Sequence, residues 1–232
     1  MIKFENTEVF NFEGAIRGMR NPLNSWDKSD TVISLELRRG AKHGKVYAEI
    51  GPNDLALMKK LIKAGSDHRK FMRQIFVSVD ITAPLYWWKE FDTYKVATVS
   101  NSCSTMHKIH DKEFTLEDFS HEHLINEPFT EEEPGVVKTY NLQAKMMLET
   151  TVIVLNTARK MYLKTGDKKY WRNMIQLLPS SYNQRRTITL NYETLYNIYG
   201  SRHNHKLDEW SIGFMDWIKS LPYAEELIID RR

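Results

Sequence analysis

A long run of regularly spaced small and apolar residues between Val137 and Lys164 constrains the fold more than any other feature of the sequence. Its members alternate steps of three and four positions, which places them on one stripe of an α-helix. They are Tyr140, Ala144, Met147, Thr151, Val154, Ala158 and Met161. The run predicts a helix about 40 Å long. Its stripe is either the spine of the domain or a contact between subunits.

The rest of the chain mixes both kinds of periodicity. Alternating patterns predict strands at residues 7–12, 31–37, 45–50 and 185–190. Helical patterns cover residues 51–65, 83–94, 167–179, 191–202 and 205–221, and Asn53 or Asp54 is the expected cap of the first of these. We therefore expect a single α+β domain over residues 1–232. Its helices should concentrate in the C-terminal half, around a mixed sheet.

The bulk composition excludes several classes of protein. The chain has one cysteine, so it has no internal disulfide, and we expect it in a reducing compartment, the cytoplasm. It has no signal-peptide pattern and no apolar stretch of transmembrane length, so we expect no membrane partner. Its net charge of +3 is too small to indicate a nucleic-acid polymer as partner.

Common catalytic motifs are missing from the sequence. There is no glycine-rich phosphate loop and no G-x-S-x-G turn around a serine nucleophile. Eight histidines include close pairs, but there is no H-E-x-x-H and no cysteine pair. Exposed histidines are therefore the favoured interpretation, and no metal is expected.

Cys103 lies in a run of small polar residues, Asn101 to Thr105. It could be a nucleophile if a cation such as Lys95 or His107 lowered the pKa of its thiol. The favoured alternative is a small packed side chain.

The same run resembles part of the signature of the flavin-dependent thymidylate synthases, R-H-R-x-x-S-x-N-x-x-S-x-R. Asn101 and Ser104 match its N-x-x-S spacing once one residue of offset is absorbed. Upstream, Glu90 stands near the family's glutamine, and residues 93–95 stand near its R-H-R triplet.

The C-terminal half resembles the same family more closely. Residues 178–179 match its L-P pair, and Asn191, Leu195 and Arg202 match its N-x-R-x-L and the arginine that follows. Glu193 departs from the pattern, because the family has an arginine there. Residues 205–210 resemble the cluster of histidine, glutamine and glutamate that comes next.

The resemblance implies a reaction and its cofactors. Family members transfer a one-carbon unit from methylenetetrahydrofolate to C5 of deoxyuridylate (dUMP). Reduced FAD supplies the hydride and NADPH reduces the flavin again. The family is homotetrameric, with active sites shared between subunits, and its chemistry needs no cysteine nucleophile.

The resemblance also implies roles for individual residues. For the flavin cofactor it implies Asn191, Asn101, His68, Tyr94 and Lys95. For the nucleotide it implies Glu90, Ser102, Ser104, Thr105, His107 and Arg202, and Arg202 would also polarise the uracil ring. Two interpretations have structural alternatives. Arg202 could simply complement a helix dipole. Trp87 and Trp88 could stack on a planar ring of a ligand, or they could be core residues.

Several arginines of the family are absent, including most of R-H-R and the last one of the signature. Three functions therefore stay open. The first is an active synthase with a rearranged phosphate site. The second is an enzyme of the same fold that modifies another pyrimidine nucleotide or uses another carbon donor. The third is a nucleotide- or flavin-binding protein without turnover.

Overall fold

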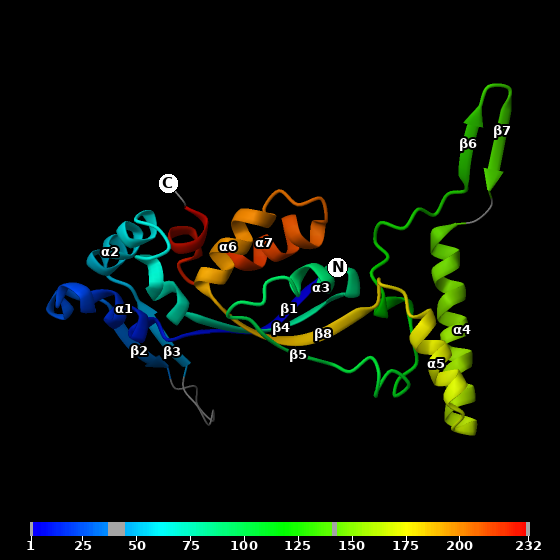
Figure 1. The fold of residues 1–232 in the computed structure, drawn as a ribbon, viewed down its shortest axis with the longest axis horizontal. Helices are drawn as coiled ribbons and strands as arrows, with labels where there is room; N and C mark the ends of the chain where they lie inside the picture. Colours follow the sequence, from blue (N-terminus) through cyan, green and yellow to red (C-terminus); the bar gives the residue numbers. More distant parts are fainter. Residues whose placement is uncertain (1, 37–44, 141–142, 231–232) are drawn as a thin grey trace. The chain divides into compact units, whose positions relative to one another are not determined.

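The computed structural model describes residues 2–36, 45–140 and 143–230 and confirms the α+β class (Figure 1). The strands are β1 (Lys3–Phe10), β2 (Val32–Glu36), β3 (Lys45–Glu49), β4 (Phe76–Pro84), β5 (Val99–Ser102), β6 (Phe129–Glu133), β7 (Val136–Tyr140) and β8 (Asn183–Asn191). The α-helices are α1 (Phe12–Arg20), α2 (Pro52–Lys63), α3 (Leu85–Phe91), α4 (Ala144–Thr165), α5 (Lys168–Leu177), α6 (Tyr192–Arg202) and α7 (Met215–Lys219).

Four strands form one sheet in the order β1, β4, β8, β5. In β4, Val77, Val79 and Ile81 are buried while the residues between them are half-buried, as the two-residue period of a strand requires. Two further sheets have two antiparallel strands each: β2 pairs with β3, and β6 pairs with β7.

The chain divides into two compact units. Unit 1 contains residues 82–92 and 102–186, and unit 2 contains residues 2–81, 93–101 and 187–232. That all 232 residues act as one domain stays a prediction. No helix within the described ranges is both long and apolar enough to cross a membrane.

Unit 1 has an aromatic core. Trp87, Trp88 and Phe91 of α3 are fully buried, and the rings of Trp87 and Phe91 stack with their centres 5.1 Å apart. The indole nitrogen of Trp88 donates a 3.0 Å hydrogen bond to the carbonyl of Gln184. The two tryptophans are therefore core residues rather than a stacking platform. A second cluster joins α4 and α5 through Leu148, Leu155, Ala158 and Met174, with Ile109, Phe114 and Phe119.

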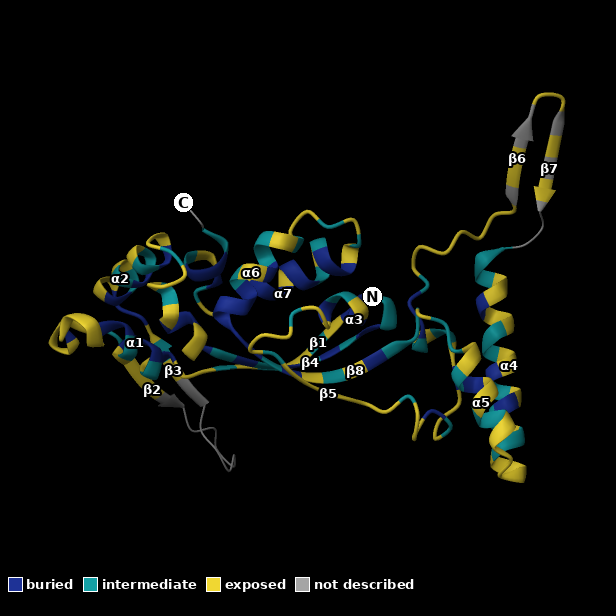
Figure 2. Ribbon diagram, viewed as in Figure 1, coloured by how far each residue is buried: buried dark blue, intermediate teal, exposed yellow. Residues whose placement is uncertain are grey.

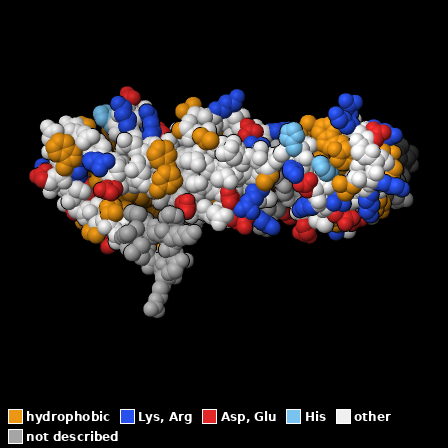
Figure 3. Space-filling model, turned by 90° about the horizontal axis from the view of Figure 1, so that it is seen from below, with side chains coloured by type: hydrophobic (Ala, Val, Ile, Leu, Met, Phe, Trp, Pro, Cys, Tyr) orange, Lys and Arg blue, Asp and Glu red, His pale blue; other side chains and the backbone are white. Residues whose placement is uncertain are grey.

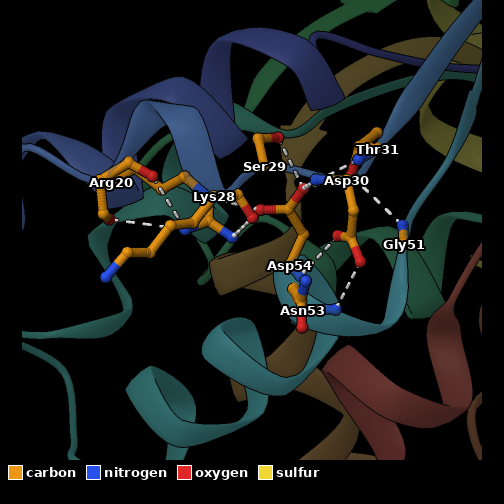
Figure 4. A network of polar contacts seen from close by, with 9 residues as sticks. Arg20, Lys28, Ser29, Asp30, Thr31, Gly51, Asn53 and Asp54 are labelled. Carbon is orange, nitrogen blue, oxygen red and sulfur yellow. Dashed lines mark hydrogen bonds and ion pairs between the residues drawn. The ribbon is translucent and has the colours of Figure 1, made fainter.

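Unit 2 contains a buried ion pair between Arg20 and Asp54 (Figure 4). Arg20 Nε lies 2.6 Å from Asp54 Oδ1, and Ser29 and Thr31 donate hydrogen bonds to the other carboxylate oxygen. Burial alone would raise the pKa of Asp54, but the hydrogen bonds from Thr31, Ser29 and Arg20 together lower it.

The predicted cap of α2 was wrong. The helix begins after Gly51, and the side chain of Asp30 accepts hydrogen bonds from the backbone N–H groups of Asn53 and Asp54. The capping carboxylate therefore comes from a distant segment, and local sequence could not indicate it.

The long helix also differs from the prediction in two ways. First, α4 begins at Ala144, and residues 136–140 form β7 instead. Gly135 turns the chain with a φ of +83°, and the β-branched residues that follow favour a strand. Second, the predicted stripe is only partly buried, because Ala158 is buried whereas Met147 and Val154 are exposed. Exposed and buried residues alternate along α4 (Figure 2). The buried stripe contains Leu148, Leu155 and Ala158.

Candidate functional site

Arg202, the last residue of α6, is half-buried in unit 2 and is held by an aromatic residue from a distant segment. Its Nε donates a 2.8 Å hydrogen bond to the hydroxyl of Tyr94. The Tyr94 ring centre lies 5.6 Å from the guanidinium carbon. Tyr94 thus fixes the guanidinium group by a hydrogen bond and by a cation–π contact.

Trp210 contributes a second aromatic ring beside the same guanidinium. Its ring centre lies 5.1 Å from the guanidinium carbon of Arg202 and 6.2 Å from the ring centre of Tyr94. The buried Trp210 is the second residue of the π-helical turn η5 (Glu209–Phe214). The ring centre of His205 lies 6.3 Å from that of Trp210, in an edge-to-face arrangement. These four residues, Arg202, Tyr94, Trp210 and His205, are called the arginine cluster below.

Asn191 sets the start of the helix that carries Arg202. It is buried, and its side-chain oxygen accepts hydrogen bonds from the backbone N–H and the hydroxyl of Thr194. Its amide nitrogen donates to the carbonyl of Arg73 at 3.3 Å. Asn191 therefore has a structural role as the N-cap of α6. Its contact with flavin stays a prediction.

Glu193, which departs from the family pattern, forms an ion pair inside unit 2. Both carboxylate oxygens accept hydrogen bonds from Arg69 Nε, the shorter at 2.9 Å, and both side chains are largely buried. The guanidinium carbon of Arg69 also lies 4.3 Å from the ring centre of Tyr196. Arg69 thus neutralises the carboxylate that stands where the family has an arginine.

Three other predicted flavin residues of unit 2 are exposed. Lys95 follows Tyr94 in the chain, Asn101 is the third residue of β5, and His68 precedes the 3-10 helix η3 (Arg69–Gln74). Within the described part of the chain, their side chains form no hydrogen bond or ion pair. They are available to a ligand.

The remaining predicted nucleotide residues belong to unit 1. Ser104 lies in a tight turn, in which its Oγ accepts hydrogen bonds from the backbone N–H groups of Met106 and His107. Ser102 and His107 are exposed, and Thr105 is half-buried beside them in the chain. Glu90 is half-buried in α3. The structure therefore divides the predicted site residues between the two units.

Cys103 is exposed, so the favoured interpretation of a packed side chain was wrong. Its backbone joins β8, because its N–H donates to the carbonyl of Arg185 at 2.9 Å. Among the described residues, no three His, Cys, Asp or Glu side chains gather as a metal site would require. On the face drawn in Figure 3, Lys and Arg side chains are interspersed with Asp and Glu.

The chemistry of the arginine cluster suits a planar ligand with carbonyl or anionic oxygens. A guanidinium group provides several N–H donors in a fixed plane, and charge-assisted hydrogen bonds are stronger than neutral ones. The hydroxyl of Tyr94 accepts a hydrogen bond from Nε and orients the guanidinium group. Preorganisation of this kind increases the stabilisation of charge that develops on a bound ring.

Comparison with solved structures identifies the fold. Thymidylate synthase X (ThyX) from Helicobacter pylori, solved with FAD and dUMP, matches with a TM-score of 0.65 over 99% of this chain and 97% of that chain, at 14% identity. The UMP/dUMP methylase PolB from Streptomyces cacaoi, bound with 5-Br dUMP, matches with a TM-score of 0.55 over 98% and 94%, at 15% identity.

The chain has the fold of the flavin-dependent thymidylate synthases. No protein-family model and no curated protein matches the sequence. The resemblance found in the motifs is therefore confirmed at the level of this fold, while sequence identity to these structures is low.

Sequence reasoning found Arg202 and Tyr94 but assigned them to different ligands, and it gave no role to Trp210. A loop separates Trp210 from α6, so no helical spacing relates it to Arg202. The available signals were the concentration of aromatic and basic residues from Tyr199 to Trp210 and the resemblance of residues 205–210 to the family's cluster.

Proposed function

We propose that the protein is a flavin-dependent enzyme that methylates C5 of dUMP, with methylenetetrahydrofolate as carbon donor and NADPH as reductant. One observation carries the proposal: Arg202, the arginine that the motifs assign to the uracil ring, lies against both Tyr94 and Trp210 and is hydrogen-bonded to Tyr94. The fold supports it, because the structures it resembles were solved with FAD and dUMP or with a dUMP analogue.

Arg202 binds and polarises the pyrimidine in this proposal. Its guanidinium N–H groups donate to a ring carbonyl, and the bond strengthens wherever negative charge develops on that oxygen during the reaction. Tyr94 is a positioning residue, because its hydroxyl holds Nε and prevents rotation of the group. The half-buried setting keeps the interaction stronger than it would be in water.

The exposed polar residues of unit 2 fit the chemistry of a dinucleotide cofactor. Lys95, His68 and Asn101 offer an ammonium, an imidazole and an amide, which are donors suited to a pyrophosphate. A bound flavin would supply the hydride that reduces the transferred carbon. These residues bind and orient it in the proposal, and the hydroxyls of Ser102, Ser104 and Thr105 with His107 and Glu90 contribute to the nucleotide.

We further propose that the protein works as a homotetramer in a reducing compartment, the cytoplasm. The fold resemblance supports the assembly, and the single exposed Cys103 supports the compartment, since such a thiol survives best where disulfide formation is suppressed.

A second substrate is favoured by the likeness to PolB, which is described as a methylase of both UMP and dUMP. The same residues could then accept a ribonucleotide if Arg202 contacts O4, because this carbonyl lies on the side of the pyrimidine ring remote from the 2′-hydroxyl. A parallel titration with UMP and dUMP separates the two substrates.

Absorbance of the purified protein after incubation with FAD, followed by titration with dUMP, tests the proposal. We expect a flavin spectrum that stays with the protein through gel filtration and changes when dUMP binds. Binding of both ligands without any product would favour a nucleotide- and flavin-binding protein without turnover. Failure to retain flavin would contradict the proposal.

A further inference from the structure

Arg69 is a largely buried arginine that uses only part of its hydrogen-bonding capacity inside the protein. Its side chain is 14% exposed, and its Nε donates to both carboxylate oxygens of Glu193. Within the described part of the chain, neither Nη nitrogen of Arg69 donates a hydrogen bond to the protein, and neither is sealed from solvent. The N–H donors on these two nitrogens are therefore left for a ligand.

Arg20, the other arginine of a buried ion pair in unit 2, shows the contrast. Its Nε donates to Asp54, its Nη1 donates to the carbonyl of Ser25 at 3.1 Å, and its Nη2 donates to the carbonyl of Lys28 at 3.0 Å. A buried donor without a partner costs free energy, so an arginine with a purely structural role is expected to have all its nitrogens bonded in this way. Arg69 departs from that expectation at both Nη nitrogens.

The guanidinium group of Arg69 is held in a fixed orientation by α6. Glu193 accepts from the Nε edge, and the ring centre of Tyr196 lies 4.3 Å from the guanidinium carbon. One contact restricts rotation of the group and the other supports its plane. A planar fork that is already fixed loses little conformational freedom when a ligand binds to its open edge.

The charges around this open edge favour an anion. The 3-10 helix η3 has no acidic residue and contributes the cations Arg69, Lys70 and Arg73. Lys70 is exposed, and its side chain forms no hydrogen bond or ion pair among the described residues. Glu193 and the exposed Asp67 balance only part of this charge. A phosphoryl group fits best, because its several acceptor oxygens match the two parallel N–H donors of a guanidinium fork.

We infer that the open Nη edge of Arg69 binds a phosphoryl group, and that Arg69 supplies the guanidinium group that Glu193 has replaced on α6. The cation thus comes from η3 and is fixed against the same turn of α6 by the residue that took the arginine's place. The ligand is the diphosphate of the flavin dinucleotide, because the motifs assign the adjacent His68 to that cofactor. This choice of ligand rests on the proposed function, whereas the phosphoryl site itself does not.

A charge-neutral double variant removes the site. Arg69→Met with Glu193→Gln eliminates the guanidinium fork, leaves no unpaired buried charge and keeps the net charge of the protein. Lys219→Met with Asp216→Asn is the matched control, because it neutralises an exposed ion pair of α7 in the same unit. Glu193→Gln alone keeps the fork. Arg69→Lys keeps the ion pair but loses the fork, and it decides the test if the double variant does not fold. Circular dichroism verifies folding.

Calorimetric titration with FAD, with inorganic pyrophosphate and with dUMP measures the effect. The double variant should lose about tenfold or more in affinity for FAD and for pyrophosphate, as expected for lost charge-assisted hydrogen bonds, and should bind dUMP unchanged. Arg69→Lys should lose less than the double variant. Glu193→Gln should bind FAD and pyrophosphate at least as tightly as the wild type, and the α7 control should match the wild type. A loss for dUMP alone would overturn the assignment to the flavin.

The two probes separate this inference from the proposed function. Saturable pyrophosphate binding that the double variant loses would uphold the phosphoryl site even in a protein that retains no flavin, and the proposed function alone would then fail. Equal affinities of the wild type and the double variant for FAD and pyrophosphate would overturn the inference and leave the proposed function intact. A wild-type protein that binds neither probe would contradict both.

Discussion

The guanidinium Nε of Arg202 donates a 2.8 Å hydrogen bond to the hydroxyl of Tyr94, although 108 residues separate the two in the chain. The bond connects the end of α6 to the segment that follows α3, and Trp210 lies against the same guanidinium. A side chain that only complemented a helix dipole would not need two aromatic neighbours and an oriented hydrogen bond. The arrangement favours a binding role for Arg202.

Replacement of Arg202 separates these roles. Arg202→Ala should weaken dUMP binding or turnover about tenfold to more than a hundredfold, since a charge-assisted hydrogen bond is worth roughly 1.5–3 kcal/mol. FAD affinity should stay nearly unchanged. Calorimetric titration with each ligand measures both effects, and Lys206→Ala, an exposed cation in the following loop, is the control. A stability loss of only about 0.3–1 kcal/mol with intact binding would reduce Arg202 to a helix-end charge.

Tyr94→Phe removes the hydroxyl and keeps the ring. Because the phenyl ring still packs near Arg202, only the orienting hydrogen bond is lost, and it is worth roughly 0.5–1.5 kcal/mol. We expect the dUMP affinity to fall about two- to tenfold, and FAD affinity to change less. Tyr170→Phe, in α5, should change neither affinity. Equal losses for both ligands would mean that Tyr94 does not act through Arg202.

The ion pair of Glu193 with Arg69 predicts a charge-swap experiment. Glu193→Arg restores the residue type of the family but places two arginines together in a largely buried site. We expect the free energy of unfolding to fall by roughly 3–5 kcal/mol, as for other broken buried pairs. Adding Arg69→Glu should recover a substantial part of the loss. Urea denaturation measures all three proteins, and a stable single variant would show that the pair is unimportant.

The free energy of unfolding should fall at acid pH because of Asp54. Its pKa is lowered in the folded protein, because hydrogen bonds from Thr31, Ser29 and Arg20 outweigh the effect of burial. The folded protein therefore binds the proton more weakly than the unfolded chain, whose ordinary value is 3.8. The stabilisation is complete above that value and is lost as the pH falls through the lowered pKa.

The measurement is the free energy of unfolding from about pH 7 to about pH 3. Asp54→Asn should lower stability at neutral pH and flatten the acid part of the profile. Asp27→Asn, an exposed carboxylate in the same region, is the control. An Asp54→Asn profile parallel to that of the wild type would assign the acid loss to other groups.

Cys103→Ala should retain most of any flavin-dependent turnover, because the proposed route needs no enzyme thiol. The side chain is exposed, so the substitution creates no cavity and should leave stability nearly unchanged. Initial rates of both proteins under the same conditions provide the comparison. A loss of several orders of magnitude with intact ligand binding would revive the thiol nucleophile.

Local patterns predicted most of the elements but failed where distant residues decide the structure. The helix of residues 51–65 and the strand of residues 185–190 follow from their own periodicity, and both are present. The cap of α2 comes from Asp30, which is remote in sequence. The start of α4 was placed too early, because the apolar repeat continues back through Tyr140 although the β-branched residues around it favour a strand.

Sequence patterns likewise predicted some residues of the candidate site and missed the partners that come from distant segments. The motif resemblance pointed to Arg202 and to Asn191, whose side chain proves to cap α6. The partners of Arg202 come from other segments, and so does the cation that compensates Glu193. Contacts over such sequence separations leave no periodic signal in a single sequence.

Product analysis tests the central claim most directly. The FAD-loaded protein is incubated anaerobically with NADPH, methylenetetrahydrofolate and dUMP, and the nucleotides are examined by chromatography and mass spectrometry. The account predicts a thymidylate product, formed by the wild-type protein and greatly reduced with Arg202→Ala. Retained flavin and bound dUMP without any methylated nucleotide would contradict it.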